Sequence, residues 1–257
     1  MGLPLVWRGV EVAGMSIFDD PGLFGRQWAD HYDSTDNPDP VPEADFLASV
    51  ARGGRVLELA IGTGRVALPL AERGLAVEGV EASPEMVARM RAKPGGADIP
   101  VVIGDMADVA VEGPFDLVYL VFNTLFNLVD GERQADCFRN TARVLASDGA
   151  FVVQAYVPDP ADFEGNEQAQ VRNVTEDLVE LRVHRYDLAS QTFIRQTVTF
   201  RDGSVRLEPF AMRYLWPGQI DALAEQAGLR LAERYADYDR SPFTTDSKNH
   251  VSVYRPA

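Results

Sequence analysis

The chain is poor in cysteine and lacks long apolar runs. Cys137 is the single cysteine among 257 residues, which excludes an internal disulfide bond and a zinc site built from cysteines. No apolar stretch approaches the roughly 20 residues of a membrane-spanning helix. The first 14 residues contain one arginine and no long apolar core, so they make a poor signal peptide. We therefore expect a cytoplasmic protein in which Cys137 is a buried, unreactive thiol.

Basic side chains are also scarce. Lysine and arginine number 24 against 39 aspartates and glutamates, which gives a net charge of −15. This charge argues against a nucleic-acid partner, because phosphates bind to basic surfaces. Residues 1–50 hold nine of the acids and only two arginines. A solvated acidic face is the ordinary interpretation of this segment, and attraction of a cationic substrate is the alternative.

The order of apolar and helical segments predicts a doubly wound α/β fold. Hydrophobic residues make up 46% and charged residues 25% of the chain, as in ordinary globular proteins. Strand-like and helix-like segments alternate, which predicts a parallel sheet with helices on both faces. The expected strands span residues 55–60, 76–81, 100–105, 115–122 and 150–157, and a helix followed by strands at 229–238 and 249–255 closes the chain.

A different pattern interrupts this alternation at about residues 165–215. The segment is rich in valine, threonine, phenylalanine and tyrosine, with polar and apolar residues nearly alternating. It also contains the tight-turn signal "RDGS" at residues 201–204. We predict three or four antiparallel strands here, inserted into the larger domain.

Acidic residues and glycines follow successive expected strands. In an open parallel sheet, ligands bind beyond the carboxyl ends of the strands. Glu58, Glu81 and Asp105 stand near three such ends, and Gly62 and Gly64 follow the first strand. Glycines let ligand atoms lie against the backbone, and a carboxylate such as Glu81 can accept from both hydroxyls of a ribose. These residues predict a nucleotide-like ligand.

Two cofactors fit this pattern. "GTGRVA" formally satisfies the dinucleotide motif, and Glu81 lies 19 residues after Gly62, close to the expected distance. An NAD(P)-dependent oxidoreductase is therefore one alternative. Against it, Glu58 stands four residues before Gly62, where an acid is awkward beside a pyrophosphate, and no second catalytic domain follows. A non-catalytic binding protein with the same fold is another alternative.

Four stretches together resemble the successive motifs of class I S-adenosylmethionine-dependent methyltransferases. They read "VLELAIGTGR", "VEGVEASPEMV", "GDMADV" and "PFDLVYLVFNTLFNL", and the resemblance covers residues 45–157. It implies a Rossmann-like seven-stranded sheet whose last strand is antiparallel, with S-adenosyl-L-methionine as cofactor. The antiparallel insertion is similar to that of glycine and amino-sugar N-methyltransferases. The expected domains are an N-terminal extension and helical lid at 1–50 and a methyltransferase domain at 51–257.

The same resemblance implies roles for individual residues. Glu58 is expected to organise the glycine loop and the amino end of the cofactor, Glu81 to bind the ribose hydroxyls, and Asp105 to accept from the adenine amino group. Ala60 replaces the glycine usual in the family and is expected to narrow the space beside the methionine moiety. The expected cofactor-binding residues are Tyr32, Glu58, Ala60, Gly62, Gly64, Glu81, Ala82, Asp105, Met106, Phe122 and Asn123.

The acceptor is expected to be a small molecule methylated on a nitrogen or oxygen atom. Residues 16–38 contain aromatic side chains and a proline break, which are typical of a lid that closes over the cofactor. His31 and Tyr32 in this segment are the candidate catalytic residues, with His31 as the base; a helix-packing histidine is the alternative. We expect no metal, no nucleic acid and no membrane as partner, and a homodimer is a candidate assembly.

Overall fold

The computed structural model describes residues 11–12, 15–16, 20–34, 37–163 and 167–257. The expected N-terminal extension at residues 1–14 lies outside these residues, apart from Glu11–Val12 (β1). A short strand, Met15–Ser16 (β2), pairs with it. None of the helices in the described part of the chain is long and apolar enough to cross a membrane.

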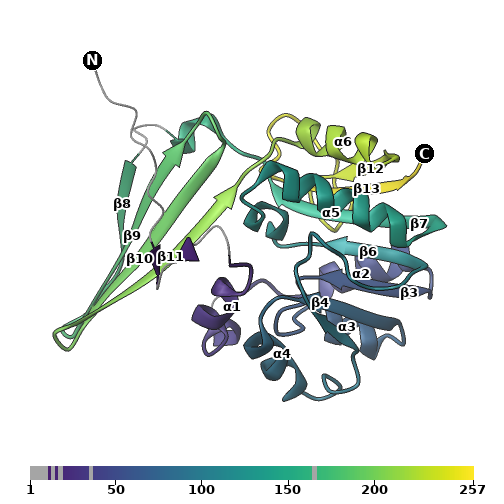
Figure 1. Ribbon diagram of the computed structural model, residues 1–257. Coiled ribbons are helices and arrows are strands. Elements are labelled where there is room, and N and C mark those ends of the chain that lie inside the picture. The colour runs from purple at the N-terminus through teal and green to yellow at the C-terminus, as the bar shows by residue number, and fades with distance from the viewer. Residues whose placement is uncertain (1–10, 13–14, 17–19, 35–36, 164–166) are drawn as a thin grey trace.

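A seven-stranded sheet forms the centre of the molecule, with strand order β12-β13-β7-β6-β3-β4-β5 (Figure 1). Strands β3 to β7 pair in parallel, whereas β13 is antiparallel to both β7 and β12. The predicted fold, including an antiparallel last strand, is confirmed. The strands are Arg55–Leu59 (β3), Ala76–Glu81 (β4), Val101–Ile103 (β5), Phe115–Leu120 (β6), Leu145–Tyr156 (β7), Leu229–Tyr235 (β12) and Asn249–Pro256 (β13).

Helices cover both faces of this sheet, because its central strands are apolar on both sides. Two buried clusters result: one contains side chains of α5 and α6, such as Phe138 and Ile220, and the other contains side chains of α2, α3 and α4, such as Leu47, Leu70 and Met90. The helices are Val41–Ala51 (α2), Ala67–Glu72 (α3), Pro84–Arg91 (α4), Gly131–Val144 (α5) and Pro217–Gln226 (α6).

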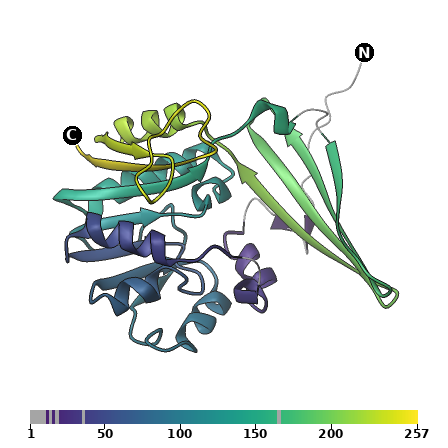
Figure 2. The ribbon, with the colours of Figure 1, turned by 180° about the vertical axis from the view of Figure 1, so that it is seen from behind.

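The predicted insertion is a four-stranded antiparallel sheet that projects from the body of the molecule (Figures 1 and 2). Its strands are Glu167–Val174 (β8), Leu178–Asp187 (β9), Thr192–Arg201 (β10) and Ser204–Arg213 (β11), in the order β11-β10-β9-β8. The turn between β10 and β11 places Asp202 at φ 50° and Gly203 at φ 74°. Positive φ at both central residues is the geometry that a two-residue hairpin turn favours.

The expected helical lid is only partly helical in the front segment. Among the described residues between 20 and 34, Leu23–Trp28 (α1) is α-helical and is followed by a 3-10 turn at Tyr32–Ser34 (η1). Gly22 is the N-cap of α1, and Asp20 accepts a hydrogen bond from its backbone nitrogen at 3.0 Å. The sequence Asp20-Pro21-Gly22 is typical of a turn, so the helix begins directly after it.

Candidate active site

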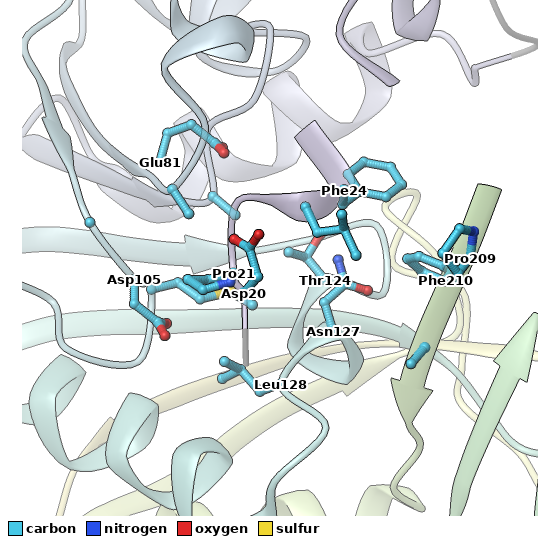
Figure 3. Close-up of a pocket in the computed structure, with 16 residues that line it drawn as sticks. Asp20, Pro21, Phe24, Glu81, Asp105, Thr124, Asn127, Leu128, Pro209 and Phe210 are labelled. Atoms are coloured by element: carbon cyan, nitrogen blue, oxygen red, sulfur yellow. The ribbon is translucent and has the colours of Figure 1, made fainter. Parts of the chain in front are cut away.

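A cavity lies between the carboxyl ends of β4 and β5 on one side and α1 and β11 on the other (Figure 3). Five of the predicted cofactor residues line it: Ala60, Glu81, Ala82, Asp105 and Met106. Its remaining walls come from Asp20, Pro21, Leu23, Phe24, Gly104, Thr124, Asn127, Leu128, Pro209, Phe210 and Ala211. The other predicted residues, among them Glu58, Gly62, Gly64, Phe122, Asn123, Tyr32 and His31, lie outside this lining.

Glu81 connects the end of β4 to the glycine loop that follows β3. Its carboxylate accepts from the backbone nitrogen of Gly62 at 2.8 Å and from that of Ser83 at 2.9 Å. Gly62 and Gly64 have φ values of 58° and 78°, which a residue with a side chain rarely adopts. The pKa of Glu81 is raised by burial, and the backbone hydrogen bonds oppose this shift. The carboxylate retains lone pairs for a ligand, because each oxygen can accept more than one hydrogen bond.

Glu58 lies deeper than Glu81, and its burial favours the neutral form of the carboxyl group. It is 5% exposed, and the Tyr119 hydroxyl donates to it at 2.7 Å. Burial raises the pKa of Glu58 to about 8, whereas the hydrogen bond from Tyr119 lowers it. A cation that approached this carboxyl group would favour its ionised form.

A buried ion pair beside Glu58 was missed by sequence reasoning. Arg65 donates to both carboxylate oxygens of Glu43, and the hydroxyl of Tyr238 donates to the same carboxylate at 2.8 Å. The guanidinium of Arg65 also lies 5.0 Å from the centre of the Phe122 ring. This network places a fixed cation next to the predicted methionine end of the cofactor. Arg65 follows Gly64 directly, but its partners come from distant parts of the chain.

Three residues other than glycine adopt left-handed backbone conformations just after β3 and β6. Ala60, Phe122 and Asn123 have φ values of 55°, 60° and 62°. The last two are held by β7, since the Phe122 nitrogen donates to the Gln154 side chain at 2.6 Å and the Asn123 side chain accepts from the Tyr156 nitrogen at 2.6 Å. Strain of this kind concentrates at functional sites.

Asp105 is already engaged at the far end of the cavity. One of its oxygens accepts from the Ala107 nitrogen at 2.8 Å, and the other forms an ion pair with Arg133 at 2.9 Å. Arg133 pairs with Asp108 as well, also at 2.9 Å. These contacts fix the carboxylate at the end of β5, where Figure 3 shows it apart from Glu81.

Helix α1 and strand β11 form the wall opposite the acids. The rings of Phe24 and Phe210 are 5.5 Å apart, and Figure 3 shows both at the side of the cavity away from Asp105. His31 packs on Trp28 with ring centroids 4.8 Å apart, and its Nε2 lies 3.9 Å from a carboxylate oxygen of Glu208.

The sequence pointed to part of this wall. Thr124 and Asn127 belong to the stretch "FNTLFNL", and Phe24 belongs to the expected lid. No sequence pattern identified Phe210 as a cavity residue, because its position depends on how the inserted sheet packs against the body of the molecule.

Comparisons with known proteins agree with this arrangement. A family model described as "Methyltransferase domain" matches residues 56–149. The CcbJ methyltransferase from Streptomyces caelestis is 36% identical, with a TM-score of 0.85 over 93% of this chain and 99% of that chain. The cypemycin N-terminal methyltransferase of a Streptomyces species is 27% identical over 91% of this chain and 98% of its own. At 19% identity, the SAM-bound amino pentose methyltransferase CalS10 from Micromonospora echinaspora shares the fold, with a TM-score of 0.66 over 89% of this chain and 96% of that chain.

The match to the CcbJ methyltransferase decides between the alternatives raised by the sequence. It exceeds 30% identity and extends over almost the whole of both chains, so neither a dinucleotide-dependent oxidoreductase nor a non-catalytic protein is supported. The chain belongs to the class I S-adenosylmethionine-dependent methyltransferases.

Proposed function

We propose that this methyltransferase acts on an amine nitrogen of a small molecule. The observation that carries the proposal is the wall opposite the cofactor acids, where the rings of Phe24 and Phe210 meet. The cavity also holds the carboxylate of Asp20, which pairs with Arg26. Aromatic faces and a carboxylate attract ammonium groups. The names of the relatives agree, since one acts on an N-terminus and another on an amino pentose.

We propose that the cofactor lies along the ends of β3, β4 and β5. Glu81, already hydrogen-bonded to the glycine loop, would accept from the ribose hydroxyls, and Asp105 and Met106 would border the adenine. Glu58 would face the amino end of the cofactor together with the Tyr32 side chain. Ala60, Gly62, Gly64 and Ala82 would supply the backbone surface, and Phe122 and Asn123 would border the departing methyl group.

When bound, the cofactor supplies a methyl group activated by its sulfonium leaving group. The chain has to bring the acceptor nitrogen into line with that methyl group and exclude water, so that orientation provides most of the rate. Helix α1 is placed to do this because it bridges α4 and β11. His31, near Glu208, is the proposed base that removes the proton of an ammonium acceptor. A homodimer and a cytoplasmic location remain predictions.

The test is methyl transfer from isotopically labelled S-adenosylmethionine to matched acceptors. An amino sugar, the same sugar with a hydroxyl in place of the amine, and a peptide with a free N-terminus are compared by mass spectrometry. Label on nitrogen supports the proposal. Label on the hydroxyl sugar alone would overturn the amine assignment and leave methyl transfer intact. Absence of label from every acceptor, together with no binding of the cofactor by calorimetry, would overturn the proposed function itself.

A further inference from the structure

One face of the inserted sheet carries a row of basic side chains next to the cavity. Arg195 of β10 pairs with His184 of β9 and with Phe210 of β11, and Arg182 of β9 pairs with Thr197 of β10. Directly paired residues, and residues two apart on a strand, point to the same face of a sheet. Arg182, His184 and Arg195, here called the basic row, therefore share one face with Phe210.

Within the part of the chain that the structure describes, the basic row forms no ion pair. The Nε atoms of Arg182 and Arg195 and the Nδ1 atom of His184 are buried without a hydrogen-bond partner. Glu180 lies near enough to oppose the lowering of the pKa of Arg182 by burial, but the two side chains do not form a salt bridge. Buried polar atoms normally find partners, so these three atoms require an explanation.

Many arginines elsewhere in the described part of the chain form ion pairs. Carboxylates pair with Arg26, Arg55, Arg65, Arg73, Arg89, Arg133, Arg139, Arg206, Arg234 and Arg240. A chain with 39 acids and a net charge of −15 has many carboxylates with which to neutralise an arginine cluster. Some arginines elsewhere also have no carboxylate partner, but the basic row brings two arginines and a histidine together on one face of a sheet without one.

Placing these basic side chains together without a counter-charge destabilises the folded state. Burial and repulsion by Arg182 and Arg172 lower the pKa of Arg195 to about 10. Burial and the neighbouring arginines also lower the pKa of His184. Partly buried positive charge without a counter-charge destabilises a protein, and a bound anion would remove that cost.

The basic row is adjacent to the proposed acceptor wall. The guanidinium of Arg195 lies 4.6 Å from the centre of the Phe210 ring, and Phe210 lines the cavity. Arg195 does not line the cavity itself, so an acceptor whose amine lies in the cavity would reach it past the Phe210 ring. Glu208, on the same face, is already paired with Arg206 at 2.9 Å.

We propose that the basic row binds an anionic group, a carboxylate or a phosphate, on the far end of the methyl acceptor, with Arg195 as the main ligand. The planar guanidinium presents two parallel donors, which suit either group. This inference rests on the proposed function for the identity of the ligand as an acceptor. The anion site itself can be tested without any methyl transfer.

The first experiment uses the full chain with S-adenosylhomocysteine and measures melting temperature against added inorganic phosphate or acetate, with chloride at equal ionic strength as the baseline. A ligand that binds only the folded state raises the melting temperature. We expect phosphate or acetate to do so in the wild type, and the more effective anion indicates which group the acceptor carries. Arg195→Gln should weaken the fitted anion affinity by about tenfold or more.

Arg185→Gln is the matched control, because Arg185 lies on β9 next to His184 but on the opposite face, where it pairs with Glu167. It should leave the anion response unchanged. The proposal is overturned if neither anion stabilises the wild type beyond chloride. It is equally overturned if Arg195→Gln responds like the wild type, or if both variants lose the response together, since the effect would then reflect overall charge.

The second experiment compares amine acceptors that carry a carboxylate with their neutral amides. In the wild type the acid should have the lower KM, and Arg195→Gln should remove this preference while kcat changes little. An unchanged preference would overturn the role of Arg195 in acceptor binding. Calorimetry with S-adenosylmethionine runs in parallel: failure of the wild type to bind it rejects the proposed function, whatever the anion result.

Discussion

Gly25 in α1 and Ser83 at the start of α4 lie in direct contact. A Cβ atom added to Gly25 would be 2.2 Å from the Ser83 Cβ and 2.4 Å from its hydroxyl oxygen. Ser83 is itself fixed, because its hydroxyl caps α4 and its backbone nitrogen donates to Glu81. Helix α1, which carries Phe24, therefore packs directly against the residues that hold the predicted ribose site.

Gly25→Ala should displace α1 from α4, because neither backbone nor a capping side chain can yield by the distance required. We expect a loss of about 1–3 kcal/mol in unfolding free energy, as for other overpacked sites, and weaker S-adenosylhomocysteine binding. Chemical denaturation and calorimetry measure these effects. Gly218→Ala is the control, since a Cβ there meets no atom within 4 Å and the residue lies in helix α6. Equal changes in unfolding free energy and in S-adenosylhomocysteine affinity for the two variants would contradict direct packing of α1 on α4.

Glu81→Ala should weaken S-adenosylmethionine binding on the order of tenfold to several hundredfold, because hydrogen bonds to a charged acceptor contribute roughly 1.5–3 kcal/mol each and do not add fully. Calorimetry gives the dissociation constant. Glu78→Ala on the same strand, which breaks a surface pair with Arg55, should leave affinity unchanged. Unchanged affinity in Glu81→Ala would remove the ribose assignment.

Glu58 should make the ligand-free protein less stable as the pH rises. Its pKa is raised in the folded state to about 8, so folding favours the protonated form. The resulting stabilisation is present below the ordinary pKa of about 4.3 and is lost as the pH rises through 8. Urea unfolding between pH 5 and 9 should show this decline, and Glu58→Gln should flatten it. A decline of equal size in the variant would assign the effect to other groups.

Ala60→Gly should stabilise the loop after β3. Ala60 has a φ of 55°, and a left-handed conformation costs a residue with a side chain about 1–2 kcal/mol relative to glycine. Part of this gain is offset by the greater freedom of glycine in the unfolded chain. The melting temperature should therefore rise slightly or stay constant, with cofactor affinity retained. Ala67→Gly within α3 is the contrasting variant and should be destabilising. A destabilised Ala60→Gly protein would show that the methyl group makes contacts that outweigh the strain.

The front segment should become better protected from hydrogen exchange when the cofactor binds. We expect S-adenosylhomocysteine to slow amide hydrogen exchange across α1 and η1 more than across α5, because α1 lines the cavity and η1 follows it, whereas no residue of α5 lines the cavity. Mass spectrometry of peptides from residues 23–34 and 131–144 measures the difference. Equal protection in both regions would identify the segment as a fixed arm, and His31 would lose its support as the base.

The sequence predicted most of what depends on local pattern. The alternation of apolar strands and helices located β3, β4, β6 and β7, and the position of Glu81 at the end of β4 followed from its place in that pattern. The hairpin at Asp202 and Gly203 was predictable because two adjacent positive φ values favour this residue pair.

Features that depend on contacts between distant segments were not predictable. The bonds that join Arg65, Glu43 and Tyr238 link the loop after β3, helix α2 and the segment after β12, and no short-range pattern reports such a contact. Phe210 enters the cavity only because the inserted sheet packs against α1. The basic row likewise depends on strand register. The alternation of polar and apolar residues does not determine the register, because a shift of two residues keeps every side chain on the same face.

The inserted sheet supplies its part of the cavity lining from one continuous stretch of chain. Strands β8 to β11 follow β7 and precede α6, and, among the described residues, they line the cavity with Pro209, Phe210 and Ala211. Substitutions in this stretch would change the cavity at these three residues and leave Ala60, Glu81 and Asp105, which line it from the seven-stranded sheet, untouched. Under the proposed function, acceptor preference can therefore be redesigned by exchanging one continuous segment of chain between relatives.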